Sequence, residues 1–336
     1  MSMKTIFIWI MALVPVTLWA QFPPAAGLPG TTAMHADSSA FVAWATGCTT
    51  ERGLMRIDKP HLGYASFGDD TLVLGRPGAG GASEIVYDVV SLGDGGSSIV
   101  TFASPIYNGE GPDFAVFENG FDIDDAYDPS GILHFLELAF VEVSSDGEHF
   151  FRFPAVTHVP FDQQLNGSGG TDPSQIHNFA GKYDQYYGTP FDLDEVEDNA
   201  LLDKNRVTHV RIIDVVGCIK PEYATYDSEG HVVNDPWFTS YDTGGFDLEA
   251  VGVIHDLAHG VSSNESETVS VYPNPVRDRL SVKGDNIQSI EVFNLVGQLI
   301  MSTTETTLDM SNLTEGIYFL RVVLENGMVT KRIVKQ

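Results

Sequence analysis

The sequence predicts an all-β protein in two parts, a large β-sandwich of the jelly-roll kind followed by a small immunoglobulin-like β-sandwich. Short apolar runs and alternating apolar and polar residues recur along the chain, and glycine, aspartate and serine separate them. Helical periodicity is scarce. The chain has 336 residues, enough for one large core and a second, smaller one.

Residues 1–20 are predicted to be a secretory signal peptide. Lys4 supplies the positive start, residues 6–18 form an apolar stretch, and Ala20 ends it. The stretch is short for a membrane span. No later stretch is long and apolar enough to cross a bilayer.

The remaining chain divides at a polar segment without periodicity, residues 261–268, which we interpret as a linker. It separates a large domain at 21–260 from a small one at 269–336.

In the large domain, five segments have the apolar character of buried strands. Turn-forming residues precede the first, and a Ser-Ser-Asp-Gly turn at 144–147 ends the third. Two short helices are expected at 173–177 and 193–202, the second with Asp192 as its N-cap. The predicted strands are residues 97–102, 114–117, 135–143, 207–216 and 246–254.

In the small domain, Pro273 and Pro275 cannot donate to a β-ladder, so we expect them in a turn before the first strand. The dipeptide 326–327, Asn-Gly, predicts a tight hairpin. Period-2 alternation predicts the strands themselves, with apolar residues at Leu280, Val282, Ile290, Val292, Leu299, Ile317, Phe319 and Val323, and with Tyr318 and Leu320 on the other face of their strand.

Four segments in this small domain, 271–276, 289–300, 313–322 and 330–335, resemble in order the C-terminal sorting domain of the type IX (Por) secretion system. The resemblance implies export across the outer membrane of a Bacteroidota-type bacterium, contact with the secretion machinery, and removal of the tail. The protein would then be attached to the cell surface or released. An ordinary immunoglobulin-like module is the alternative.

The large domain also carries a resemblance, through phrases such as 111–120, 135–147 and 244–251. They resemble a group of uncharacterised bacterial cell-surface proteins, which implies no activity. The segment 246–251 is also similar to the last strand of galactose-binding-like jelly rolls, which often ligate a structural calcium ion.

Charge separates the two domains. The chain has 18 basic and 46 acidic residues, a net charge of −28, and the region between signal peptide and small domain holds 10 basic against 39 acidic residues. Such a surface repels nucleic acid and anionic lipid. It suits an extracellular protein and attracts divalent cations, although solubility alone would also explain it.

Two cysteines, Cys48 and Cys218, lie in the large domain. In an exported protein they can form one disulfide, and we predict this pairing.

Acidic residues interrupt the apolar strands. A buried carboxylate without a partner is costly, so each must face solvent, meet a base or hold a cation. Basic residues are too few for most of them, although Arg211 could pair with one. Calcium prefers oxygen ligands. We therefore predict calcium ligands at Glu118, Asp214, Asp247 and Glu249, with solvated structural acids as the alternative.

Two loops, 178–188 and 234–245, combine aromatic residues with glycine, asparagine and aspartate, a composition typical of sites for sugars and other flat-faced ligands. The alternative is that the aromatic rings anchor the loops onto the sandwich. The predicted ligand-binding residues are Tyr183, Tyr187, Asp235, Trp237 and Tyr241.

No nucleophile elbow, zinc-protease motif or phosphate loop is present, and we assign no catalytic residue. Three functions stay open. The first is a non-catalytic, calcium-stabilised surface protein that binds a glycan or another extracellular ligand. The others are a secreted polysaccharide hydrolase or lyase and an adhesive structural protein.

Overall fold

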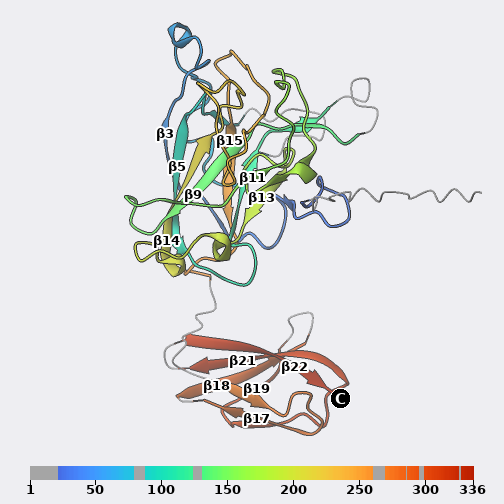
Figure 1. Cartoon of the computed structure of the whole chain (residues 1–336). Helices are drawn as coiled ribbons and strands as arrows, with labels where there is room; N and C mark the ends of the chain where they lie inside the picture. Colours follow the sequence, from blue (N-terminus) through green and yellow to red (C-terminus); the bar gives the residue numbers. More distant parts are fainter. Residues whose placement is uncertain are drawn as a thin grey trace, which may run out of the picture.

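The computed structural model describes residues 22–78, 88–123, 131–259, 269–284, 286–294, 299–324 and 327–336. The predicted signal peptide and linker therefore lie outside the described residues. Within them the protein is all-β (Figure 1). No described helix is long and apolar enough to span a membrane.

The helical content of the described chain is limited to short 3₁₀ turns. The helix expected at 193–202 is only the turn Leu193–Glu195, and the one expected at 173–177 is Pro173–Gln175. Asp192 is the predicted N-cap, because its side chain accepts a hydrogen bond from the Asp194 amide. The other two 3₁₀ turns are Pro60–Leu62 and Lys204–Arg206.

Two antiparallel sheets form a sandwich in the N-terminal part, among the described residues between 22 and 259 (Figure 1). The first has the order β1 (Met34–His35), β13 (Tyr187–Phe191), β6 (Phe114–Glu118), β15 (Asp247–Val253) and β2 (Ala43–Trp44), and β4 (Val90–Ser91) also pairs with β15. The second has the order β10 (Phe151–Arg152), β9 (Ala139–Ser144), β14 (Val207–Asp214), β5 (Ser97–Ile106) and β3 (Gly47–Glu51).

The main core lies between these sheets. It combines residues of β6 and β15 with residues of β5, β9 and β14, and three rings pack at its centre. The Phe114 centroid is 5.4 Å from Phe191 and 5.8 Å from Phe153.

Both sheets are also covered on their outer faces. Phe117 and Ala250 pack beneath Phe41 and Trp44, and loop residues such as Phe179 cover Phe140 on the other sheet. The central strands β6, β9 and β15 are therefore buried at every residue, which explains why their sequences are nearly continuous apolar runs.

A β-bulge changes the pairing of β15 with β6. Leu248 lies opposite Glu118, whereas Ala250 lies opposite Phe117. The extra residue breaks the strict alternation of faces. Leu248 contributes to the main core and Ala250 to the outer cluster, although an unbroken strand would put them on one face.

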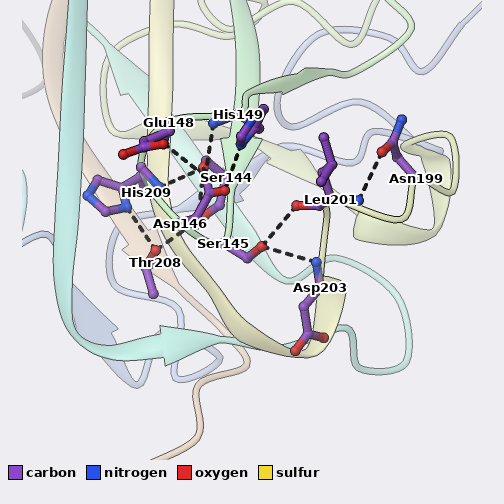
Figure 2. A network of polar contacts seen from close by, with 11 residues as sticks. Ser144, Ser145, Asp146, Glu148, His149, Asn199, Leu201, Asp203, Thr208 and His209 are labelled. Carbon is purple, nitrogen blue, oxygen red and sulfur yellow. Dashed lines mark hydrogen bonds and ion pairs between the residues drawn. The ribbon is translucent and has the colours of Figure 1, made fainter.

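The turn predicted at 144–147 joins β9 to β10 and is held by side-chain hydrogen bonds (Figure 2). The Gly147 amide donates to Ser144 Oγ at 2.8 Å, and the Glu148 and His149 amides donate to Asp146 Oδ1. Gly147 has φ +79°, and a Cβ there would lie 2.9 Å from the His209 ring, so glycine is required.

A short two-stranded ribbon contributes to the site described below. β7 (Phe121–Asp122) pairs with β8 (His134–Phe135), with Phe121 opposite Phe135 and Asp122 opposite His134. The two phenylalanine rings stack at 4.8 Å between centroids. A second ribbon pairs β11 (Val156–Thr157) with β12 (Ile176–His177).

The C-terminal part forms its own small sandwich around a separate core. One sheet has the order β16 (Ser270–Tyr272), β17 (Arg279–Lys283) and β20 (Thr307–Asp309), and the other has β19 (Leu299–Thr303), β18 (Ile287–Phe293), β21 (Gly316–Leu324) and β22 (Gly327–Lys335).

The predicted alternation in this part is confirmed at Leu280, Val282, Ile290 and Val292, which are all in the core. Two details differ. Leu299 is 50% exposed, and the prolines follow a first strand, β16, rather than preceding it. On β21 the core face is that of Tyr318 and Leu320, while Ile317 and Phe319 are partly exposed.

The predicted disulfide is wrong, because Cys48 and Cys218 are both free. Cys48 lies on β3 and packs against the main core, whereas Cys218 packs in a small cluster with Val216 and Trp237. The two thiols belong to different hydrophobic clusters, so the fold does not bring them together.

Candidate functional site

A pocket of about 210 Å³ lies where β15 begins and where the β7–β8 ribbon joins β9. Its lining combines two carboxylates, one amide and several aromatic rings. The lining residues are Phe67, Val89, Asn119, Phe121, Phe135, Glu137, Gly167, Thr239, Tyr241, Thr243 and Asp247.

Asp247, the first residue of β15, is held in a defined position. The Ser91 hydroxyl donates to its Oδ1, and Asn119 Nδ2 donates to its Oδ2 at 3.3 Å. Burial raises the pKa of Asp247 to about 7, although these two hydrogen bonds and the charge of Arg52 oppose the rise.

Glu137 is the second carboxylate of the pocket and is 6% exposed. Burial raises its pKa well above the usual range, and the negative charges of Asp247 and Glu118 raise it further. Two close carboxyl groups in an apolar setting do not both ionise easily. The pair therefore retains a proton at a pH where ordinary carboxyl groups are ionised.

Aromatic rings form the walls of the pocket. The stacked rings of Phe121 and Phe135 supply one side, and Tyr241, which is 70% exposed, supplies another. Flat apolar faces next to hydrogen-bonding groups suit a sugar ring or a similar ligand.

Glu118 adjoins this pair without lining the pocket. It is 1% exposed; its Oε2 accepts a hydrogen bond from the Gly120 amide at 2.7 Å, and its Oε1 has no partner among the described residues. Burial raises its pKa well above the usual range, and the charge of Asp247 adds to the effect. Glu118, Glu137 and Asp247 form an acid cluster.

The four residues predicted as calcium ligands do not form one group in the described structure. Glu118 and Asp247 are electrostatic neighbours, whereas the β15 bulge gives Glu249 different surroundings, near Gly78 and Asp88. Asp214 uses both oxygens for the backbone, accepting from the Phe246 and Gly95 amides at 2.8 Å each. Asp214 therefore has a structural role here.

Two of the five predicted ligand-binding residues make hydrogen bonds inside the protein instead of lining the pocket. Tyr183 is 1% exposed, and its hydroxyl lies 2.9 Å from Thr32 Oγ1. Asp235 is buried and accepts from the Leu138 amide at 2.8 Å.

Trp237 and Tyr187 also pack against the protein, whereas Tyr241 lines the pocket. Trp237 is 6% exposed and donates to Asp94 Oδ2 at 3.1 Å. Tyr187 lies edge-on to His35. The anchoring alternative thus describes most of these rings.

Glu142 is satisfied by arginines. Arg152 Nε lies 2.9 Å from its Oε1, and Arg211 Nε lies 2.8 Å from its Oε2. The expectation that Arg211 pairs with a strand acid is confirmed, so Glu142 is unavailable for a cation or ligand.

One group of side chains in the described chain converges as metal ligands do: Asp122, His134 and Asp184. His134 Nδ1 lies 2.8 Å from Asp122 Oδ1 and 2.9 Å from Asp184 Oδ1. The sequence predicted none of these three residues as a metal ligand, and residues 124–130, shortly after Asp122, lie outside the described residues. No local spacing links the three residues, since Asp184 is 50 positions beyond His134.

Comparison with known families concerns the C-terminal part. Residues 270–336 match the family described as "Secretion system C-terminal sorting domain". They are a Por secretion system C-terminal sorting domain. The sorting domain makes this chain a cargo of the type IX secretion machinery and implies secretion or an outer-surface location. This match confirms the resemblance noted in the sequence.

A curated relative is similar over a short stretch. The chain is 35% identical over 83 residues to "Ulvan lyase NLR42" of Nonlabens ulvanivorans, which covers 22% of this chain and 16% of that protein. The chain therefore matches only a small part of that protein. The sorting domain itself makes up about a fifth of this chain.

Two solved structures are distantly similar. A "Biofilm associated protein - BSP domain" is 14% identical, covering 71% of this chain and 48% of that one, with a TM-score of 0.15. A Lactobacillus rhamnosus β-glucuronidase is 11% identical, covering 86% and 45%, with a TM-score of 0.17. Similarity this low supports no functional conclusion.

Proposed function

We propose that the exported N-terminal part binds a neutral or positively charged extracellular glycan in the pocket of Glu137, Asp247 and Tyr241. The observation that carries the proposal is the meeting of two buried carboxyl groups, one of them held by hydrogen bonds, with exposed and stacked aromatic rings in one pocket. Rings stack on sugar faces, and the carboxyl and amide groups accept and donate hydrogen bonds to hydroxyls.

Charge narrows the class of ligand. The chain carries a net charge of −28, and the pocket contains two acidic side chains and no basic one among its lining residues. A polyanionic chain would be repelled by this field. A neutral polysaccharide, or one carrying amino groups, is compatible with it.

The test is a glycan panel probed with the mature chain, the Tyr241→Ala variant and a matched control, Tyr64→Ala. Tyr64 is 64% exposed and lies outside the pocket lining. We expect Tyr241→Ala to weaken binding about tenfold, in line with the loss of one stacking contact, and Tyr64→Ala to leave it unchanged. Equal binding by all three proteins would refute the pocket assignment.

Polysaccharide cleavage is the second candidate, and a specific observation favours it. Asp247 has a pKa of about 7 and Glu137 a pKa well above its usual range, and an acid that retains its proton at neutral pH can serve as a general acid. A relative named as a lyase also acts on a polysaccharide.

Release of reducing ends from neutral polysaccharides would distinguish cleavage from binding. A hydrolase should lose this activity in Glu137→Gln and in Asp247→Asn. Binding without release of reducing ends would favour the non-catalytic function.

Calcium stabilisation is proposed for Glu118 and Asp247, on the ground that their charges interact and that Glu118 Oε1 has no hydrogen-bond partner among the described residues. Because the acid cluster does not itself converge as a ligand group, backbone carbonyl or water oxygens would have to complete the site. If calcium binds there, removal by a chelator should lower the melting temperature, and added calcium alone should restore it. An unchanged melting temperature would exclude a stabilising calcium ion.

A further inference from the structure

We propose that Asp122, His134 and Asp184 bind a single divalent transition-metal ion of the Zn²⁺ or Mn²⁺ class, outside the acid cluster. The three side chains come from two places in the fold. Asp122 and His134 are directly paired on the β7–β8 ribbon, and Asp184 lies just before β13.

The backbone holds the third ligand against the ribbon. The Gln185 amide donates to Gly120 O at 2.8 Å, one residue before β7 begins, and the Tyr187 amide donates to Asp184 O at 3.0 Å. The site is therefore built by fixed elements.

His134 Nδ1 faces more carboxylate oxygens than it can hydrogen-bond. Asp122 Oδ1 lies 2.8 Å from His134 Nδ1, and the Asp184 oxygens lie 2.9 and 3.0 Å from it. A ring nitrogen carries at most one hydrogen, so it cannot satisfy two carboxylates fully. A cation at the centre would be attracted by all three groups.

The spacing also fits a metal of this size. With ligands about 2.1 Å from the ion, neighbouring ligand atoms lie about 3.0 Å apart around a six-coordinate ion and about 3.4 Å apart around a four-coordinate Zn²⁺ ion. The observed separations of 2.8–3.0 Å from the nitrogen match the six-coordinate spacing, and the ligands would move apart by a few tenths of an ångström to hold a four-coordinate ion.

Burial holds the histidine ring in one orientation. The His134 side chain is only 8% exposed, and its Nε2 atom has no hydrogen-bond partner among the described residues. The buried ring directs Nδ1 at the carboxylates, while the Asp122 side chain is 81% exposed, so an ion could enter from solvent. The nearby negative charge of Asp172 would attract that ion further.

The donor set selects the class of ion. Calcium and magnesium prefer oxygen ligands, whereas imidazole combined with carboxylates suits zinc, manganese and iron. Three protein ligands also leave at least one position for water. Calcium, if it binds this protein, is therefore not expected here.

The site has a consequence for the pocket, and this step rests on the proposed function. Asp122 directly follows Phe121, and His134 directly precedes Phe135. These two phenylalanines are the stacked pair in the pocket wall. A bound ion would link the ribbon to residue 184 and so hold this wall in place. Glycan affinity should then increase when the metal is present.

The experiment is calorimetric titration of the mature, metal-free chain with Zn²⁺, Mn²⁺ and Ca²⁺ in separate runs. We expect one site for Zn²⁺ or Mn²⁺ with at least about 100-fold higher affinity than for Ca²⁺. Asp122→Asn, at an exposed side chain, should fold normally and lose about tenfold or more, and His134→Ala should abolish the site.

His149→Ala is the matched control. His149 Nδ1 also lies 2.8 Å from a carboxylate, that of Asp146 (Figure 2). This pair is exposed, and no third ligand joins it among the described residues. The control should bind the ion as the wild type does.

Three results would overturn the proposal: no one-to-one binding of either transition metal, tighter binding of Ca²⁺, or an equal loss in His134→Ala and His149→Ala. Because the titration contains no glycan, a failure of the proposed function leaves this result standing.

Discussion

Glu249 offers a direct test of what a buried, unpaired carboxyl group costs this protein. It is 1% exposed in the fully buried strand β15, and neither of its oxygens has a hydrogen-bond partner among the described residues. Burial raises its pKa from near 4.5 to about 8. The Gly78 amide opposes this rise in part but lies outside hydrogen-bond geometry.

The sign of the pH dependence follows from that shift. Between pH 4.5 and 8 the folded protein keeps a proton on Glu249 that the unfolded chain releases, so its contribution to stability is greatest below pH 4.5 and is lost as the pH rises through 8. Each unit of pKa difference corresponds to about 1.4 kcal/mol. The cost at pH 7 is then about 3 kcal/mol, and at pH 5 about 1 kcal/mol.

Glu249→Gln removes the titrating group while keeping its shape. We expect the variant to be more stable than the wild type by up to about 3 kcal/mol at pH 7, with a smaller gain at pH 5. Urea unfolding of the mature chain measures this through tryptophan fluorescence. Trp44 and Trp237 both lie in the N-terminal part, and the sorting domain has no tryptophan, so the signal reports the large sandwich alone.

Glu148→Gln, at an exposed acid in the β9–β10 turn, is the control and should change stability by less than about 0.5 kcal/mol. A loss of stability in Glu249→Gln at pH 7 would refute the reasoning. If the wild type were more stable than Glu249→Gln only when calcium is present, Glu249 would be a cation ligand, as its position in an apolar strand suggested.

Two further predictions concern the other buried charges. Glu142→Ala leaves Arg152 and Arg211 without their shared partner and should destabilise the large sandwich by about 2–4 kcal/mol in urea unfolding. The expected loss is smaller than for a fully buried pair because both arginines are partly exposed. A loss below about 1 kcal/mol would contradict this role. Lys182 is 3% exposed, and burial lowers its pKa to about 7. Between pH 7 and 10.5 this lysine is therefore protonated in the unfolded chain but neutral in the folded protein, so the stability of the fold rises with pH in that window. Lys182→Met should therefore be more stable than the wild type at pH 6 and lose this advantage by pH 10, and a pH-independent difference in melting temperature would show that the lysine charge is not the cause.

Local pattern was enough to predict much of the fold. The alternation of Leu280 with Val282 and of Ile290 with Val292 identified core faces of the sorting domain, and Asp192 was identified as an N-cap. These features depend on residues a few positions apart, because strand faces and caps are set by short-range backbone geometry. Secretion was likewise readable, since the sorting domain is recognised from linear motifs near the C-terminus.

The sites, by contrast, were decided by tertiary structure. Glu137 meets Asp247 only because the start of β15 lies beside the residues that precede β9, and the β15 bulge separates Asp247 from Glu249 although the sequence spacing puts them on one face. Asp184 meets His134 across 50 residues of chain, while Cys48 and Cys218 pack in different clusters. Such contacts depend on which strands pair and where a bulge occurs. Many residues contribute to that choice, so no short segment of sequence contains it.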